Sequence, residues 1–296
     1  MGSLEFRLRL VNLPIIDTHP HVIAADTERY PHAPLGGHQS DWSRKRPVDV
    51  DHLIAEQKRA GIAKAVVVQA STCYGHDNSY VADSVAAHPS RFTGVFSCDI
   101  LAPDACDMIA FWMRRGLTGM RLFTTGSTMP GQAGWLDDPR SFAGWQKAEE
   151  AGLPVCLQMT AAGIPQLEDI LCRFPGLRVI LDHLARPTQE DGPPYTAADS
   201  LWRLARFPGV YLKVTERNLV GARAGKATPD TFFGRLIAEF GAPRITWGSN
   251  FPASERSLPE LVALAQDTLG FVPEADREWI FARTAKTLYP ALTNHQ

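Results

Sequence analysis

Two histidines near the start of the chain directly follow a short apolar segment, in the run Asp17-Thr18-His19-Pro20-His21. Residues i and i+2 of an extended chain point to the same side, so His19 and His21 can converge on one point. Two imidazoles placed in this way can bind a divalent metal ion or polarise the carbonyl group of a substrate. The chain has nine histidines, so a chance His-x-His pair is the alternative.

Other polar residues follow later apolar segments in the same manner. His183 comes after the segment 177–182, and Asn250 comes after the segment 244–247. Because a lone histidine at the end of a strand is often only a satisfied polar residue, the position of His183 in a series of similar segments is what suggests a function. Together with His19 and His21 it predicts one polar site.

Basic side chains also stand at the ends of predicted strands. An arginine fork matches a carboxylate in two hydrogen bonds, which makes Arg121 and Arg186 candidates for binding an anionic group. With Ser71 and Lys213, they predict a small anionic or polyhydroxylated substrate. For Arg121 and Lys213, an internal ion pair or hydrogen bond is the alternative.

The elements that must position these residues alternate along the whole chain. Short β-branched runs predict eight strands, at residues 15–17, 65–69, 92–98, 117–123, 153–159, 177–182, 210–214 and 244–247. Amphipathic patterns between them predict helices, and a spacing of about 30 residues per unit is that of parallel βαβ units. A single-domain (β/α)8 TIM-type barrel over 1–296 is therefore the leading fold, with an open doubly wound sheet second.

Two segments fall outside this alternation. The Pro-, Gly- and His-rich segment 24–48 is predicted to be a loop over the barrel mouth, and 273–289 is predicted to be a closing C-terminal helix. Active sites of such barrels lie at the carboxyl ends of the strands, where the histidines and arginines above are placed.

The composition excludes several classes of protein. There are 30 Lys+Arg against 32 Asp+Glu, with no sustained basic stripe, so nucleic-acid binding is not expected. The apolar runs are too short to cross a bilayer. Five widely spaced cysteines without a Cys-x-x-Cys pair are typical of reduced thiols, so we expect a cytoplasmic enzyme with a small-molecule substrate. Its oligomeric state cannot be predicted from these features.

The order and spacing of several motifs resemble the amidohydrolase superfamily, specifically the family that includes 2-pyrone-4,6-dicarboxylate lactonase and related sugar lactonases. The motifs are Asp17-Thr18-His19-Pro20-His21, Val67-Val68-Gln69-Ala70-Ser71, Asp77-Asn78, Gly119-Met120-Arg121-Leu122, Leu181-Asp182-His183 with Arg186-Pro187, Tyr211-Leu212-Lys213 and Trp247-Gly248-Ser249. The resemblance implies a distorted (β/α)8 barrel that hydrolyses an ester, lactone or amide at its mouth. His19, His21 and His183 would then polarise the scissile carbonyl.

One residue departs from the family pattern. The family ends its eighth strand with an aspartate that takes a proton from water, and this chain has Asn250 there. A carboxamide cannot accept that proton. Glu216, just past the seventh strand, is the nearest alternative base, and Asn250 would orient water or substrate. An engineered Asp→Asn change would also account for the residue, as would different chemistry or the loss of catalysis.

Metal binding is open at this point. Members of the superfamily that this chain resembles build a two-metal centre with a Lys or His at strands four and five. Here the predicted fifth strand ends Leu157-Gln158-Met159 and the fourth offers Arg121, so the resemblance does not imply a two-metal centre. If a metal is bound, His19, His21 and His183 would hold it. The sequence thus predicts either no metal or one weakly bound divalent ion, with Zn2+ the first candidate.

These features predict a hydrolase of the lactonase type. The alternatives are a metal-dependent non-hydrolytic lyase on the same barrel, such as a decarboxylase, and a ligand-binding barrel that has lost its general base.

Overall fold

The computed structural model describes residues 14–124 and 134–293, within which eight parallel strands form one sheet in sequence order. The strands are β1 (Ile15–Asp17), β2 (Ile62–Val68), β3 (Phe92–Ser97), β4 (Gly119–Phe123), β5 (Val155–Gln158), β6 (Val179–Asp182), β7 (Val210–Val214) and β8 (Ile245–Trp247). The backbone N–H and hydroxyl of Thr18 donate to the Trp247 carbonyl at 3.3 and 2.7 Å, so β1 also meets β8. The predicted (β/α)8 barrel is confirmed.

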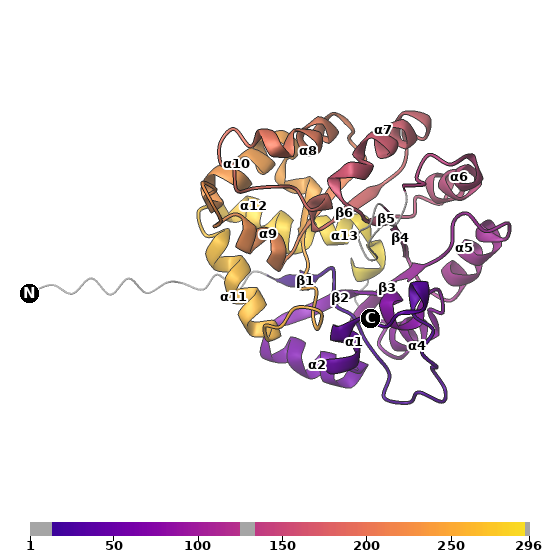
Figure 1. Cartoon of the computed structure of the whole chain (residues 1–296). Coiled ribbons are helices and arrows are strands. Elements are labelled where there is room, and N and C mark those ends of the chain that lie inside the picture. Colours follow the sequence, from indigo (N-terminus) through magenta and orange to yellow (C-terminus); the bar gives the residue numbers. More distant parts are fainter. Residues whose placement is uncertain (1–13, 125–133, 294–296) are drawn as a thin grey trace, which may run out of the picture.

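Most helices surround the sheet on its outer side, whereas the last one packs against its inner side (Figure 1). The helices are α1 (Asp41–Lys45), α2 (Val50–Arg59), α3 (Ser71–Tyr74), α4 (Ser79–Ala87), α5 (Ala105–Arg114), α6 (Phe142–Glu150), α7 (Ile164–Arg173), α8 (Asp199–Arg203), α9 (Glu216–Gly221), α10 (Pro229–Phe240), α11 (Leu258–Thr268), α12 (Glu274–Glu278) and α13 (Thr284–Leu288). Their starts follow from the sequence. The Asp49 side chain accepts from the His52 N–H at 2.8 Å, and Ser257 and Glu260 form a capping box at α11.

Alternate residues of each strand face the two sides of the barrel wall. In β2, Ala65 and Val67 pack in the outer core with the helices, whereas Val66 and Val68 belong to a smaller inner cluster. The C-terminal segment completes this inner cluster, and its Tyr289 is fully buried there. A side chain at Gly119 would place its Cβ 2.9 Å from the Tyr289 ring, so this position in β4 needs a glycine.

The predicted C-terminal helix is a continuous helical run with a change of hydrogen-bonding pattern. α12 leads into one π-helical turn at Trp279–Arg283, and α13 follows directly. The π turn packs against β8 and β1.

Some predicted strands are longer than the observed ones. Leu117, Leu153 and Leu177 are fully buried but precede β4, β5 and β6 rather than belonging to them. An apolar run predicts that residues are buried but not that they are hydrogen-bonded in a sheet. These three leucines are buried in the outer core without joining the sheet, which is why the strands were predicted to start too early.

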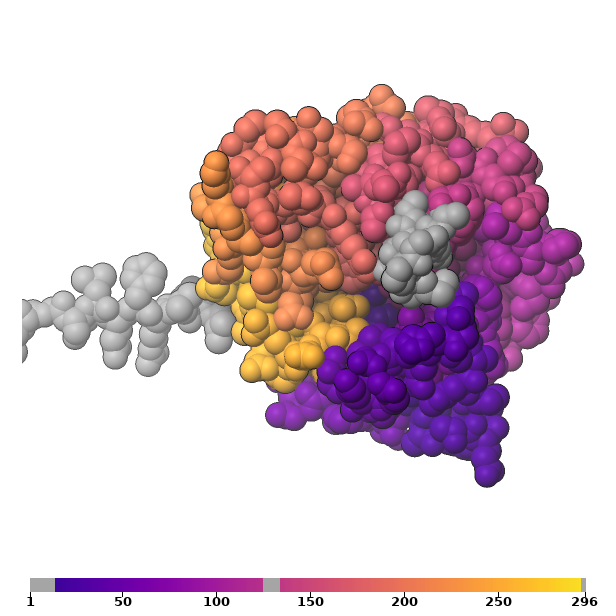
Figure 2. All heavy atoms as spheres, viewed as in Figure 1, coloured from indigo at the N-terminus to yellow at the C-terminus, as the bar shows by residue number. Residues whose placement is uncertain are grey.

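The segment 24–48 lies at the mouth of the barrel. Arg46 ties it to the loop after β8, because its Nε and Nη2 donate to the carbonyls of Pro252 and Ala253 at 3.2 and 3.0 Å. Figure 2 shows this early part of the chain, in indigo and purple, beside the yellow C-terminal part, and α2 contacts α11. Over residues 14–124 and 134–293, no helix has the length and apolar character needed to span a bilayer.

Candidate active site

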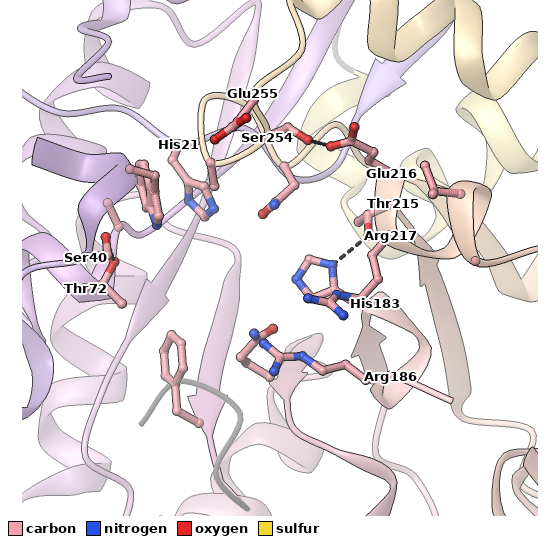
Figure 3. A pocket seen from close by; sticks show the side chains of 18 of the residues that line it. His21, Ser40, Thr72, His183, Arg186, Thr215, Glu216, Arg217, Ser254 and Glu255 are labelled. Carbon is pink, nitrogen blue, oxygen red and sulfur yellow. Dashed lines mark hydrogen bonds between the residues drawn. The ribbon is translucent and has the colours of Figure 1, made fainter. Parts of the chain in front are cut away.

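A cavity of about 820 Å³ opens at the carboxyl ends of the strands (Figure 3). Seven of the eight strands contribute a polar side chain from their ends. These are His21, Ser71, Arg121, Gln158, His183, Thr215 and Asn250. The cavity therefore lies where active sites of (β/α)8 barrels are found.

The three predicted histidines are brought together. The ring centroids of His19 and His21 are 5.0 Å apart, and those of His19 and His183 are 5.1 Å apart. Asp17 positions His19, because its Oδ1 accepts the backbone N–H groups of His19 (3.0 Å) and Ser249 (2.8 Å). This contact joins the ends of β1 and β8. Burial of Asp17 raises the pKa of its carboxyl group.

His183 begins an unusual left-handed turn. Four consecutive non-glycine residues, from His183 to Arg186, have φ between 55° and 58°. Each such residue costs roughly 1 kcal/mol or more, so the surrounding structure must hold the turn. Asn218 does so by donating from its Nδ2 to the His183 carbonyl at 2.9 Å. The turn allows both His183 and Arg186 to line the cavity.

A network of buried charges lies directly beneath the cavity. Asp182 is fully buried, forms an ion pair with Lys213 Nζ and accepts a hydrogen bond from Arg121 Nε, each at 2.8 Å. Burial alone would raise the pKa of Asp182, but the two cations outweigh it and hold the pKa well below its usual range. Burial lowers the pKa of Lys213, but Asp182 reverses the effect and the net shift is upward. The ion pair is therefore charged at neutral pH.

The histidines are neutral at neutral pH. Burial, together with the Arg121 charge, lowers the pKa of His21 to about 3. Burial also lowers the pKa of His183 to about 3, although Asp182 acts in the opposite direction. His21 is additionally covered by Trp42 of the mouth loop, whose ring stacks on it with a centroid distance of 5.2 Å.

The predicted substrate-binding residues divide into two groups. Ser71, Arg121 and Arg186 line the cavity, and Arg121 also forms an internal ion pair with Asp182, which was its alternative role. Lys213 has no exposed surface and contacts Asp182 and the Cys156 sulfur, the latter at 3.4 Å. It occupies the internal ion pair that the sequence left as its alternative role. His19 is also fully buried and reaches the cavity only through its neighbours.

Glu216, the predicted base, lies at the cavity rim. Its carboxylate accepts from the Ser254 hydroxyl and from Arg256 Nε, the second at 2.7 Å. In Figure 3 it turns toward Ser254 rather than toward His183. Both of its oxygens are therefore engaged away from the histidines.

Sequence reasoning missed three residues of the site. Arg217 lines the cavity from the first turn of α9 and, with burial, lowers the pKa of Arg186. Thr215 contacts His183 Nδ1 at 2.7 Å, and Asn218 holds the left-handed turn. The signal for all three was their place directly after the seventh strand, the same rule that selected Glu216.

A divalent metal ion does not fit the donor atoms as they are arranged. Arg121 Nη2 lies 3.2 Å from His19 Nε2, so a guanidinium occupies the nitrogen that a metal would need. Lys213 and Arg121 already engage Asp182. Within the described ranges, no group of three His, Cys, Asp or Glu side chains could hold a metal ion.

The closed eightfold barrel and its polar cavity at the strand ends define the (β/α)8 class of enzymes. A family model described as amidohydrolase matches residues 16–291, and the chain belongs to this family. L-fucono-1,5-lactonase of Burkholderia ambifaria is 27% identical over 247 residues, 81% of this chain and 80% of that protein.

Two solved structures show the same fold. A proposed 2-pyrone-4,6-dicarboxylic acid hydrolase from Pseudomonas putida has a TM-score of 0.75 and 24% identity, covering 94% of this chain and 98% of that one. An amidohydrolase from Burkholderia multivorans with bound zinc has a TM-score of 0.74 and 18% identity, covering 94% and 99%. A divalent metal thus occurs among structures of this fold.

Proposed function

We propose that this enzyme hydrolyses a small lactone or ester that carries at least one carboxylate. The observation that supports this most strongly is the convergence of Arg121, Arg186 and Arg217 on one cavity. Neighbouring guanidinium groups repel one another, and a bound carboxylate would relieve the repulsion and accept paired hydrogen bonds. In Figure 3, Arg186 and Arg217 extend toward the same hollow as His183.

The reaction type is supported by the family and by the site. The relative in Burkholderia ambifaria is named for a lactone, and the sequence motifs around the histidines resemble those of lactonases. Neutral imidazoles and a guanidinium are suited to polarise a carbonyl and to move a proton without a metal ion. The Asn250 amide can orient a water molecule, while the proton must go to another group.

We further propose that the reaction needs no metal, because Arg121 holds the His19 nitrogen that a metal would require. Decarboxylation of an aromatic acid and simple ligand binding are the competing functions. Either would use the same arginines, so the products formed must decide between them.

The test is a panel of L-fucono-1,5-lactone, 2-pyrone-4,6-dicarboxylate, neutral δ-valerolactone and 2,6-dihydroxybenzoate, with and without EDTA. Ring opening is followed by proton release and decarboxylation by carbon dioxide release. We expect hydrolysis of a carboxylate-bearing lactone in both conditions. Carbon dioxide release that EDTA abolishes would favour the lyase, and inactivity on all four compounds would count against hydrolysis of this class.

Comparing the natural protein with the Asn250→Asp variant distinguishes an active enzyme from a barrel that has lost its general base. Asn250 has φ 58°, a conformation that aspartate also tolerates, so the change is compatible with the backbone. If activity appears only in the variant, the natural protein is a binding barrel that lost its base.

A further inference from the structure

The two cavity-lining histidines each engage Nδ1 with a different kind of partner, a carbonyl oxygen for His21 and a hydroxyl for His183. His21 Nδ1 lies 2.8 Å from the carbonyl oxygen of Val68. A carbonyl oxygen can only accept, so Nδ1 carries the proton and the neutral ring presents an unprotonated Nε2. His21 lines the cavity, and Trp42 and Val68 keep its ring in place.

His183 has the other arrangement. The Asn218 amide donates to the His183 carbonyl, so its Oδ1 is the acceptor that faces Thr215. The Thr215 hydroxyl lies 2.7 Å from His183 Nδ1 but 3.4 Å from Asn218 Oδ1. A contact of this length suits either a hydroxyl or a ring N–H as the donor, and the hydroxyl has one hydrogen to share between its two acceptors. We take the shorter contact as the one to which Thr215 donates, which places the proton of His183 on Nε2.

The third histidine takes no part in this division. Arg121 donates to His19 Nε2 at 3.2 Å, so the proton of His19 is on Nδ1, 3.6 Å from Asp182. His19 is fully buried. In this assignment the cavity receives one imidazole acceptor, His21, and one imidazole donor, His183, which lie apart in Figure 3.

We propose that His21 Nε2 is the general base that takes the place of the missing aspartate, and that His183 Nε2–H polarises the substrate carbonyl. His21 is next to position 250, because its backbone N–H donates to the Phe251 carbonyl at 2.8 Å. The Asn250 amide holds the water beside His21. Glu216 is less suited, since Ser254 and Arg256 engage both of its oxygens.

The proposed step conserves atoms, electrons and protons. The water oxygen bonds to the carbonyl carbon while one water proton passes to His21 Nε2, and the carbonyl π electrons move to the oxygen that His183 stabilises. When the tetrahedral centre collapses, the bond to the ring oxygen breaks. The leaving alkoxide takes the proton from His21, which returns to its neutral form. The net reaction is lactone plus water to hydroxy acid.

This assignment rests on the proposed function but has a test that needs no substrate. In the natural protein labelled with 15N-histidine, long-range proton–nitrogen correlation at pH 7 should show His21 protonated on Nδ1 and His183 on Nε2. His21→Gln and His183→Gln samples assign the signals. Thr215→Val should release His183 from its fixed tautomer. His21 protonated on Nε2 would overturn the inference even if every lactone were hydrolysed.

Steady-state kinetics provide the second test, and the substrate is whichever lactone of the panel the natural protein hydrolyses. A glutamine amide can donate a hydrogen bond but cannot accept a proton. His21→Gln should therefore lower kcat by about 100-fold or more, whereas His183→Gln should stay within about tenfold and His183→Leu should lose about 100-fold or more. His52→Gln, on the outer helix α2, is the matched control and should leave kcat unchanged.

Hydroxylamine in place of water distinguishes a base from a positioning residue. This stronger nucleophile depends less on a base, so His21→Gln should still form the hydroxamate at a rate close to that of the natural protein, and His183→Leu should not. Loss of both reactions in His21→Gln with an unchanged Tm would overturn the inference. A larger loss of hydrolysis in Glu216→Gln than in His21→Gln would assign the base to Glu216 instead.

Discussion

Removing one partner of the buried ion pair beneath the cavity should strongly destabilise the protein. Lys213 Nζ and Asp182 Oδ1 are 2.8 Å apart, and both side chains are fully buried. At an effective dielectric constant of about 20, their attraction is roughly 6 kcal/mol before desolvation is counted. Lys213→Met leaves Asp182 paired only with Arg121. Because losing a buried partner typically costs about 3–5 kcal/mol, we expect a loss of about 3 kcal/mol in the free energy of unfolding.

Urea unfolding followed by tryptophan fluorescence measures this change, and in thermal unfolding Tm should fall by about 5 °C. The Lys213→Met, Asp182→Asn double variant leaves no unpaired charge, so it should be clearly more stable than the sum of the single variants predicts. Lys45→Met, which removes an exposed ion pair with Asp41, should leave the midpoint almost unchanged. A loss below about 1 kcal/mol for Lys213→Met, or strict additivity in the double variant, would refute the reasoning.

The pH dependence gives an independent check. The pKa of Asp182 is lowered in the folded state, so its contribution is complete above its unfolded pKa and is lost as the pH falls through the folded value. The pKa of Lys213 is raised, so its contribution is complete below its unfolded pKa and is lost as the pH rises. In Lys213→Met the pKa of Asp182 should rise. The stability difference from the natural protein should therefore be largest around neutral pH, and shrink in acid below the unfolded pKa of an aspartate, roughly 4, and in base above that of a lysine, roughly 10.

Substrate binding, metal dependence and the packing of Gly119 against Tyr289 can each be tested separately. Arg217→Met should raise KM for a carboxylate-bearing lactone about tenfold or more and change KM for a neutral lactone little, as steady-state kinetics on both would show. Dialysis against EDTA should change neither kcat nor Tm, because Arg121 holds His19; loss of activity restored by Zn2+ would contradict this. Gly119→Ala should lower the free energy of unfolding by about 1–3 kcal/mol, because the added Cβ would clash with the Tyr289 ring. An unchanged Tm in thermal unfolding would contradict this clash.

The barrel could be predicted from sequence because its periodicity is local. The strand predicted at 210–214 coincides with β7, and the buried runs in β2 and β6 are continuous apolar segments, as parallel strands are. The predicted starts of β4, β5 and β6 were too early, because a buried leucine precedes the hydrogen-bonded part of each strand. The π-helical turn after α12 depends on packing against β8 and β1, which no local pattern encodes.

The candidate site was predictable as a set of strand ends but not as a set of contacts. His21, His183 and Arg186 were placed by the rule for barrels. The left-handed turn that orients His183 and Arg186 contains no glycine or asparagine, the residues that usually adopt a positive φ. The sequence of these four residues therefore did not predict the turn. Asn218 stabilises that turn from 35 positions away in sequence, and such long-range support can be seen only in three dimensions.

The buried charges and the tautomers belong to one arrangement. Asp182 fixes Arg121, and Arg121 in turn occupies the lone pair of His19. Because His19 is engaged in this way, the proposed assignment leaves the cavity with the unprotonated nitrogen of His21, set by the Val68 carbonyl, and the N–H of His183, set by Thr215. An aspartate at position 250 would have duplicated an acceptor that His21 already provides. An amide there adds both a donor and an acceptor for water, so the asparagine is compatible with hydrolysis carried out by histidines.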